Sequence, residues 1–107
     1  MEQDQVVRSL AALAQPVRLQ VFRALVVAGQ SGMTPGTMAE GLGIPANTLS
    51  FHLKELTYAG LVTPGRMGRN ITYPAALDHT NELLGSLTEN CCQGAACSLE
   101  TASASCC

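Results

Sequence analysis

Apolar residues recur at intervals of three and four along five stretches of the chain, the spacing that gathers side chains on one face of a helix. Proline at positions 16 and 35 fits the first turn of a helix, and glycine at positions 29 and 60 fits the residue at which a helix stops. These signals together predict helices over residues 6–14, 17–28 and 35–42, within 43–62, and over 75–90.

The helix predicted within residues 43–62 has two chemically different faces. Leu49, Leu53 and Leu56 fall at i, i+4 and i+7, so they share one face. The other face carries an amide, a hydroxyl, a cation and two aromatic rings, from Asn47, Ser50, Phe51, Lys54 and Tyr58. Such groups hydrogen-bond or stack on base edges and phosphates, although the solvated side of an ordinary amphipathic helix has the same composition.

A second short helix precedes this one, and the turn between them, residues 41–45, contains two glycines. Two short helices joined in this way predict a helix-turn-helix. The pattern then becomes extended from Leu61 onward and bends near Gly65 and Gly68, which predicts a strand, a turn and a strand. Pro64 confines the first strand to an edge position. The predicted fold class is mainly α with a small two-stranded β-hairpin, arranged as a winged helix-turn-helix.

The charges of the chain are unevenly placed, although the formal net charge of −2 by itself argues against a nucleic-acid ligand. The first 74 residues hold all six basic side chains and four of the eight acidic ones, so their formal charge is +2 and that of the remainder is −4. Arg66 and Arg69 stand at or beside the tip of the predicted hairpin, where they can bind phosphates or enter a minor groove. The alternative is that both are solvated charges of a surface hairpin.

The first and last predicted helices, residues 6–14 and 75–90, exceed what the core of so small a domain requires. The last helix has a broad apolar stripe formed by Ala76, Leu77, Thr80, Leu83, Leu84 and Leu87. Helix-turn-helix repressors read two half-sites about one helical turn apart, so we predict that these two helices form a homodimer interface. Packing of both helices within one chain is the alternative.

Length and cysteine usage point to a single cytoplasmic domain. A chain of 107 residues makes one small core, and no apolar run approaches the roughly 20 residues of a membrane span. The first residues lack the basic and then apolar pattern of a secretory signal. Five cysteines, an odd number, make a poor disulfide framework and suit a reducing compartment.

All five cysteines lie in the last 17 residues, at positions 91, 92, 97, 106 and 107. Thiolates select soft ions, and hard ions such as calcium and magnesium are disfavoured. Zinc prefers four ligands, commonly in a Cys-x-x-Cys arrangement that is missing here. Trivalent arsenic or antimony is satisfied by three thiolates, which Cys91, Cys92 and Cys97 supply, with Cys106 and Cys107 as further candidates. We therefore predict a helix-turn-helix and dimerisation domain over 1–90 and an inducer-binding tail over 91–107; the alternative is a tail with free thiols and no ligand.

The sequence carries no signature of catalysis, and we expect that the protein is not an enzyme. Serine–histidine–aspartate and glycine-loop phosphate patterns are missing, and no Lys, Arg or His lies near Cys91 in sequence to lower the pKa of its thiol. His79 beside Asp78 would need further ligands at helical spacing to hold a metal, and Glu82 alone is available, so we expect a solvated side chain. His52 lies next to the leucine stripe and fits either a packed structural role or a DNA contact.

These pieces together resemble the ArsR/SmtB family of metal- and metalloid-responsive repressors. The resemblance covers about residues 5–90 and is carried by the segments 13–19, 49–56, 59–62 and 66–73. It implies a homodimeric winged-helix repressor that leaves its operator DNA when an inducer binds. The DNA-binding residues that it implies are Asn47, Thr48, Ser50, Phe51, His52, Lys54, Arg66 and Arg69.

The inducer site differs from that of the best-known arsenic sensors of this family, because residues 37–41, before the recognition helix, contain no cysteine. The chain instead resembles a second arsenic-responsive subgroup, whose ligands are an adjacent Cys-Cys pair and a later Cys; Cys91, Cys92 and Cys97 fit those positions. We expect an arsenic-resistance repressor with As(III) or Sb(III) as inducer. The alternatives are a redox- or persulfide-sensing repressor of the same fold and a thiol-rich metalloid-sequestering protein that does not act on DNA.

Overall fold

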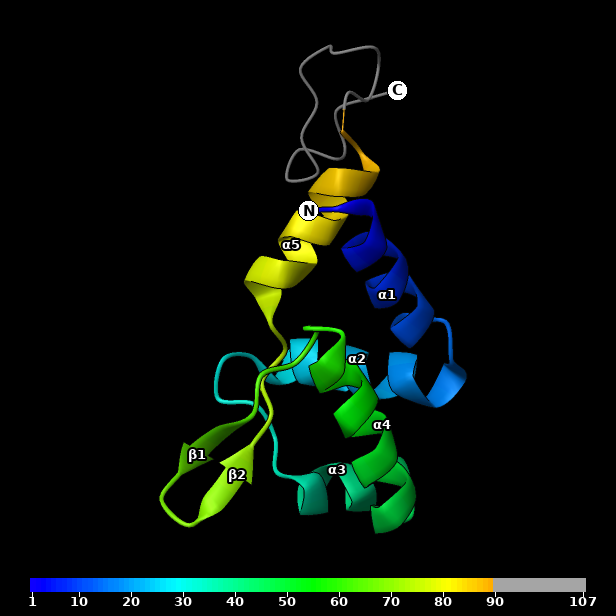
Figure 1. Ribbon diagram of the computed structural model, residues 1–107. Coiled ribbons are helices and arrows are strands. Elements are labelled where there is room, and N and C mark those ends of the chain that lie inside the picture. Colours follow the sequence, from blue (N-terminus) through cyan, green and yellow to red (C-terminus); the bar gives the residue numbers. More distant parts are fainter. Residues whose placement is uncertain (90–107) are drawn as a thin grey trace.

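The computed structural model describes residues 1–89 of the chain, which form five helices and one antiparallel hairpin (Figure 1). In chain order the elements are α1 (Gln3–Leu13), α2 (Pro16–Ala28), α3 (Pro35–Leu42), α4 (Ala46–Tyr58), β1 (Gly65–Met67), β2 (Asn70–Thr72) and α5 (Leu77–Leu87). The predicted fold class, a mainly α winged helix-turn-helix, is confirmed.

The second and third helices begin where their sequence signals place them. Pro16 opens α2, and the side chain of Gln15 accepts a hydrogen bond from the backbone N–H of Arg18 at 2.8 Å. Pro35 opens α3 after Thr34, whose hydroxyl oxygen accepts a hydrogen bond from the N–H of Thr37 at 3.2 Å. Both caps satisfy backbone donors that have no partner within the helix, so the local sequence determines these boundaries.

The wing is shorter than the sequence pattern predicts. The ladder pairs Gly65 with Thr72 and closes through a two-residue turn at Gly68 and Arg69. Leu61, expected to begin the first strand, is instead fully buried in the core. Val62 still pairs with Ala75 in an isolated antiparallel bridge. Pro64 stands between that bridge and β1, and because proline has no N–H to donate, the pairing is interrupted there.

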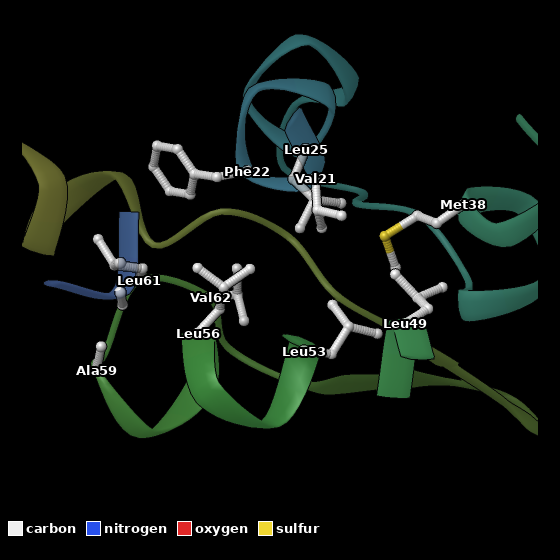
Figure 2. Close-up of a cluster of buried hydrophobic side chains, with 11 residues drawn as sticks. Val21, Phe22, Leu25, Met38, Leu49, Leu53, Leu56, Ala59, Leu61 and Val62 are labelled. Atoms are coloured by element: carbon white, nitrogen blue, oxygen red, sulfur yellow. The ribbon is translucent and has the colours of Figure 1, made fainter. Parts of the chain in front are cut away.

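The core lies between α2, the helix-turn-helix and the segment that follows α4. Figure 2 shows Leu53 and Leu56 directed from α4 toward Val21 and Leu25 of α2, with Met38 of α3 beside Leu49. All three leucines of the predicted inner face of α4 are at most 3% exposed, so that face is confirmed. Fully burying one leucine contributes about 1.5–3 kcal/mol, so this contact strongly restricts the rotation of α4 about its axis.

The first and last helices lie side by side at the end of the molecule away from the wing (Figure 1). Both differ from their predicted bounds of 6–14 and 75–90 by a few residues at their ends. Within the predicted stripe of α5 only Leu83 is buried in the described chain, whereas Leu84 is 41% and Leu87 53% exposed. On α1, Val7 is 57% exposed. A row of large apolar side chains therefore remains uncovered within one chain.

No single helix within residues 1–89 has the length and apolarity needed to cross a membrane. The pair α1 and α2 has enough apolar length when its members are taken together, but the two helices are bent by 99° relative to each other.

The loop between α2 and α3 passes closely over the end of the wing. Gly32 has a φ of +69°, and a Cβ on it would lie 2.6 Å from the backbone nitrogen of Pro74. The neighbouring Tyr73 N–H donates to the carbonyl of Met33 at 2.9 Å, so neither backbone can move freely. We expect Gly32→Ala to lower the free energy of unfolding by at least about 1–2 kcal/mol, the cost of the left-handed conformation alone, as measured by urea denaturation.

Gly36→Ala is the matched control, because Gly36 lies in α3 and a Cβ there meets nothing within 4 Å. Alanine is favoured over glycine inside a helix, so this variant should be as stable as the natural chain or more stable. Equal unfolding free energies for the two variants would show that the close approach at Gly32 does not restrict the fold.

Candidate nucleic-acid interface

The exposed face of α4 carries most of the residues predicted to contact DNA. Asn47, Thr48, Ser50 and Lys54 are exposed, and Phe51 is 55% exposed. They lie opposite the buried leucine face, and the Asn47 side chain accepts a hydrogen bond from the N–H of Thr48 at 3.0 Å. The arrangement presents donors, acceptors, an aromatic ring and a cation to the exterior on a rigid helix.

The wing places two further cations on the same side of the fold as α3. Arg66 lies on β1 and Arg69 in the turn, and both are exposed. In Figure 1 the hairpin and α3 lie at one end of the molecule, and α1 and α5 extend from the other. A groove of about 410 Å³ lies between α4 and the residues that flank the wing; its walls include Ser50, Lys54 and Pro64. The polar face of α4 and the base of the wing therefore border one concave surface.

His52 lies apart from the other predicted contacts. It is 7% exposed and packs edge-on against Phe51, with ring centroids 5.3 Å apart. Burial lowers the pKa of His52 below 6.5, the guanidinium of Arg18 lowers it further, and Glu55 acts in the opposite direction. Among the described residues its Nδ1 has no hydrogen-bond partner. The structure thus places His52 inside the packed side of α4, whereas the other seven predicted contacts are exposed.

An aromatic residue and a cation from different helices meet at the far end of α4. The guanidinium carbon of Arg8 on α1 lies 5.0 Å from the ring centroid of Tyr58, which is 71% exposed. This distance is within the range of cation–π attraction. The sequence pattern places Tyr58 on the outer face of α4. It does not predict the contact with Arg8, because Arg8 lies 50 residues away along the chain.

The expectation of a solvated His79 is wrong. Its Nε2 lies 2.8 Å from the hydroxyl oxygen of Ser9, and Ser9 is fully buried. The same hydroxyl lies 3.5 Å from the carbonyl oxygen of Ala59, the residue that follows α4. A signal for this contact was present, since Ser9 lies one helical turn from both Val6 and Leu13 on the apolar side of α1 and a buried hydroxyl needs partners.

Within residues 1–89, no group of three or more His, Cys, Asp or Glu side chains is placed to hold a metal ion. Asp78 and His79 are adjacent in sequence but form no such group. The predicted ligands Cys91, Cys92 and Cys97 and the further candidates Cys106 and Cys107 lie outside the described residues.

Comparisons with known proteins agree with this geometry. A helix-turn-helix domain family matches residues 13–64. The HTH-type transcriptional regulator NmtR of Mycobacterium tuberculosis is 37% identical over 81 residues, which are 75% of this chain and 64% of NmtR. The chain therefore spans less than two thirds of the length of that relative.

Two solved structures extend the comparison. The cadmium metal-sensor CmtR from Mycobacterium tuberculosis is 34% identical over 78% of this chain and 83% of its own, with a TM-score of 0.59. A homodimeric winged helix-turn-helix DNA-binding domain from Mycobacterium bovis, described as a possible ArsR-family transcriptional regulator, is 29% identical over 81% of each chain, with a TM-score of 0.65.

Proposed function

Because the chain belongs to the ArsR/SmtB family of winged-helix regulators, we propose that it is a homodimeric repressor that binds operator DNA and is released when As(III) or Sb(III) binds cysteine thiolates near its C-terminus. The observation that carries the DNA-binding part is the exposed polar face of α4 beside a basic wing. The fold holds the wing away from α1 and α5, the two helices of the predicted dimer interface.

In this proposal α4 enters the major groove. Asn47, Thr48, Ser50 and Phe51 lie in its N-terminal half, the part of a recognition helix that contacts base edges in helix-turn-helix proteins. An asparagine can pair with adenine through two hydrogen bonds, and an aromatic ring can contact a thymine methyl group. Lys54, Arg66 and Arg69 bind phosphates, which orient the protein on the duplex without reading the sequence. His52 is assigned no direct contact, because its ring is buried.

The exposed apolar row on α1 and α5 supports a dimer. Val7, Leu10, Leu84 and Leu87 are each at least 41% exposed, and large contiguous apolar patches mark interaction surfaces in monomeric chains. Pairing of these helices across a two-fold axis covers the same patch on both subunits and gives two α4 helices. We therefore expect an operator with two half-sites about one helical turn apart.

The inducer part of the proposal rests on the chemistry of the tail. Cys91, Cys92 and Cys97 offer three thiolates within seven residues, which suits a trivalent metalloid better than a four-ligand zinc site. The helix α5 ends shortly before Cys91. We propose that inducer binding at the cysteines changes the position of α5 and so changes the arrangement of the two subunits in the dimer. Allosteric couplings of this kind change affinity by about 5–150-fold.

The DNA-binding surface is tested by comparing charge-neutralising variants. Lys54→Gln and Arg66→Gln are each expected to weaken binding about equally on operator and unrelated duplexes and to reduce the slope of log affinity against log salt by about 1. Asn47→Ala should instead cost about 1–3 kcal/mol on the operator and relax discrimination at one base position. Fluorescence anisotropy with labelled duplexes at several salt concentrations measures both quantities.

Arg23→Gln is the control, since Arg23 is an exposed cation on α2 outside the groove between α4 and the wing. It should leave affinity and salt dependence unchanged. An effect of Arg23→Gln as large as that of Arg66→Gln would argue against a DNA surface formed by α4 and the wing.

The inducer site is tested by serine variants of the tail. Cys91→Ser and Cys92→Ser should bind operator DNA as the natural chain does but should not be released by arsenite. Cys97→Ser should lose the response to arsenite and keep that to a monomethylated arsenical, which two thiolates can hold. The double variant Cys106→Ser/Cys107→Ser is the control with the same chemical change and should still be released.

Results that differ from these expectations would identify a different ligand set or a different signal. Release of Cys91→Ser and Cys92→Ser by arsenite at the same concentration as the natural chain would contradict the proposed ligands. Release by an oxidant with a disulfide found by mass spectrometry, or by a polysulfide with a persulfide found, but not by arsenite, would favour the redox- or persulfide-sensing alternative. A chain that binds arsenite but shows no salt-sensitive duplex binding would be a sequestering protein.

A further inference from the structure

One buried hydroxyl joins three helices that have different roles in the proposed repressor. Ser9 is fully buried on α1, and a hydroxyl taken out of water must find hydrogen-bond partners. It has two, His79 on α5 at 2.8 Å and the carbonyl of Ala59 after α4 at 3.5 Å. Ser9 and His52 are the buried polar side chains of the described part of the chain. This contact therefore links the candidate dimer helices to the end of the candidate recognition helix.

The imidazole of His79 also lies against the backbone that leaves α4. A Cβ on Gly60 would lie 3.0 Å from Cε1 and 3.2 Å from Nδ1 of His79, so only glycine allows the ring to come this close. Gly60 has a φ of +82°, which favours glycine for a second reason. The segment that leaves α4 and the first turn of α5 therefore pack closely against each other at this residue.

Backbone hydrogen bonds hold the same junction together. The N–H of Leu61 donates to the carbonyl of Leu56 in the last turn of α4, and the N–H of Ala76 donates to the carbonyl of Leu61 at 2.8 Å. Any displacement of the start of α5 therefore acts on the segment that closes α4. The apolar contacts between α1 and α5 are compatible with sliding, whereas a hydrogen bond of 2.8 Å is lost on a shift of about 1 Å.

The three polar groups have two distinct arrangements. Ser9 has one proton to donate. If the imidazole carries its proton on Nε2, it donates to Ser9, and Ser9 donates to the carbonyl of Ala59, which gives a continuous chain from α5 through α1 to α4. If Nε2 is unprotonated, Ser9 donates to it, and Ala59 loses this donor. Two discrete states of one contact are what a coupling element between distant sites requires.

We propose that Ser9 and His79, packed on Gly60, are positioning residues that transmit a displacement of the α1–α5 pair to α4 and so couple inducer binding to operator release. This inference rests on the proposed repressor function and assigns the route of its regulation. Neither side chain touches DNA or inducer in this account. Their loss is expected to leave both ligands bound normally and to weaken the coupling between them.

The first experiment needs neither DNA nor inducer. Amide hydrogen exchange of Leu61 and Ala76 is measured by NMR in the natural chain, in Ser9→Ala and in His79→Leu. Both variants should exchange about 2- to 10-fold faster at these two amides, the range that corresponds to one typical hydrogen bond. The double variant should match the single ones, because both remove the same link. His79→Gln keeps a side-chain N–H donor and should restore part of the protection.

Thr80→Ala is the matched control, since the hydroxyl of Thr80 donates to the carbonyl of Ala76 at the start of its own helix and joins no second helix by a side-chain bond. It should not alter exchange at Leu61. Natural rates in both Ser9→Ala and His79→Leu, or additive effects in the double variant, would overturn the proposal.

The second experiment measures operator affinity with and without arsenite. Ser9→Ala and His79→Leu should bind operator within about 2-fold of the natural chain, while the ratio of the two affinities falls by about 2- to 10-fold. Unchanged ratios would overturn the coupling role even if exchange is faster. If the natural chain shows no operator binding or no arsenite effect while the exchange result holds, the proposed function fails, and the regulatory role fails with it.

Discussion

The burial of one face of α4 determines where the other face of that helix points. Leu49, Leu53 and Leu56 lie against residues of α2 and α3, and a rotation about the axis of α4 would bring at least one of them into water. Fully exposing a buried leucine costs about 1.5–3 kcal/mol, a large part of the stability of a small domain. The outward direction of Asn47 and Phe51 is therefore a consequence of core packing.

Parts of the fold that depend on residues close together in the sequence can be predicted from the sequence. The bounds of α3 are as predicted because Thr34, Pro35 and Gly43 act within one turn of the helix ends. The predicted start of the first wing strand at Leu61 is wrong. An apolar residue at this position suits either a strand or the core, and the tertiary structure places Leu61 in the core. The outer face of α4 was predictable because it is the complement of a periodic apolar face.

The contacts between side chains of different helices are harder to predict from the sequence. His79 stands beside Asp78 in a polar stretch, and its partner Ser9 lies 70 residues away, so no local pattern connects them. Arg8 and Tyr58 are separated in the same way. For His52, the sequence left a packed role and a DNA contact open, and the structure places the ring inside, where desolvation lowers its pKa. Residues at the boundary of two faces are the ones for which periodicity is least informative.

The proposed function combines two surfaces with opposite requirements. The DNA surface needs solvated polar groups on a rigid support, and the dimer surface needs apolar side chains that a partner covers. The fold keeps them at different ends, with α1 and α5 remote from the wing (Figure 1). In the proposed function a signal that enters near Cys91 reaches α4 along α5. The junction at Gly60 is where α5 lies against the segment that leaves α4.

The most direct test is a titration of the natural chain with a labelled duplex from the DNA upstream of its own gene. Anisotropy is recorded against a scrambled duplex of equal length and then with increasing arsenite, with antimonite, cadmium and zinc in parallel. We predict salt-sensitive binding that favours the upstream duplex and release by arsenite or antimonite at lower concentrations than by cadmium or zinc. Equal binding to both duplexes, or a complex that arsenite and antimonite leave intact, would contradict it.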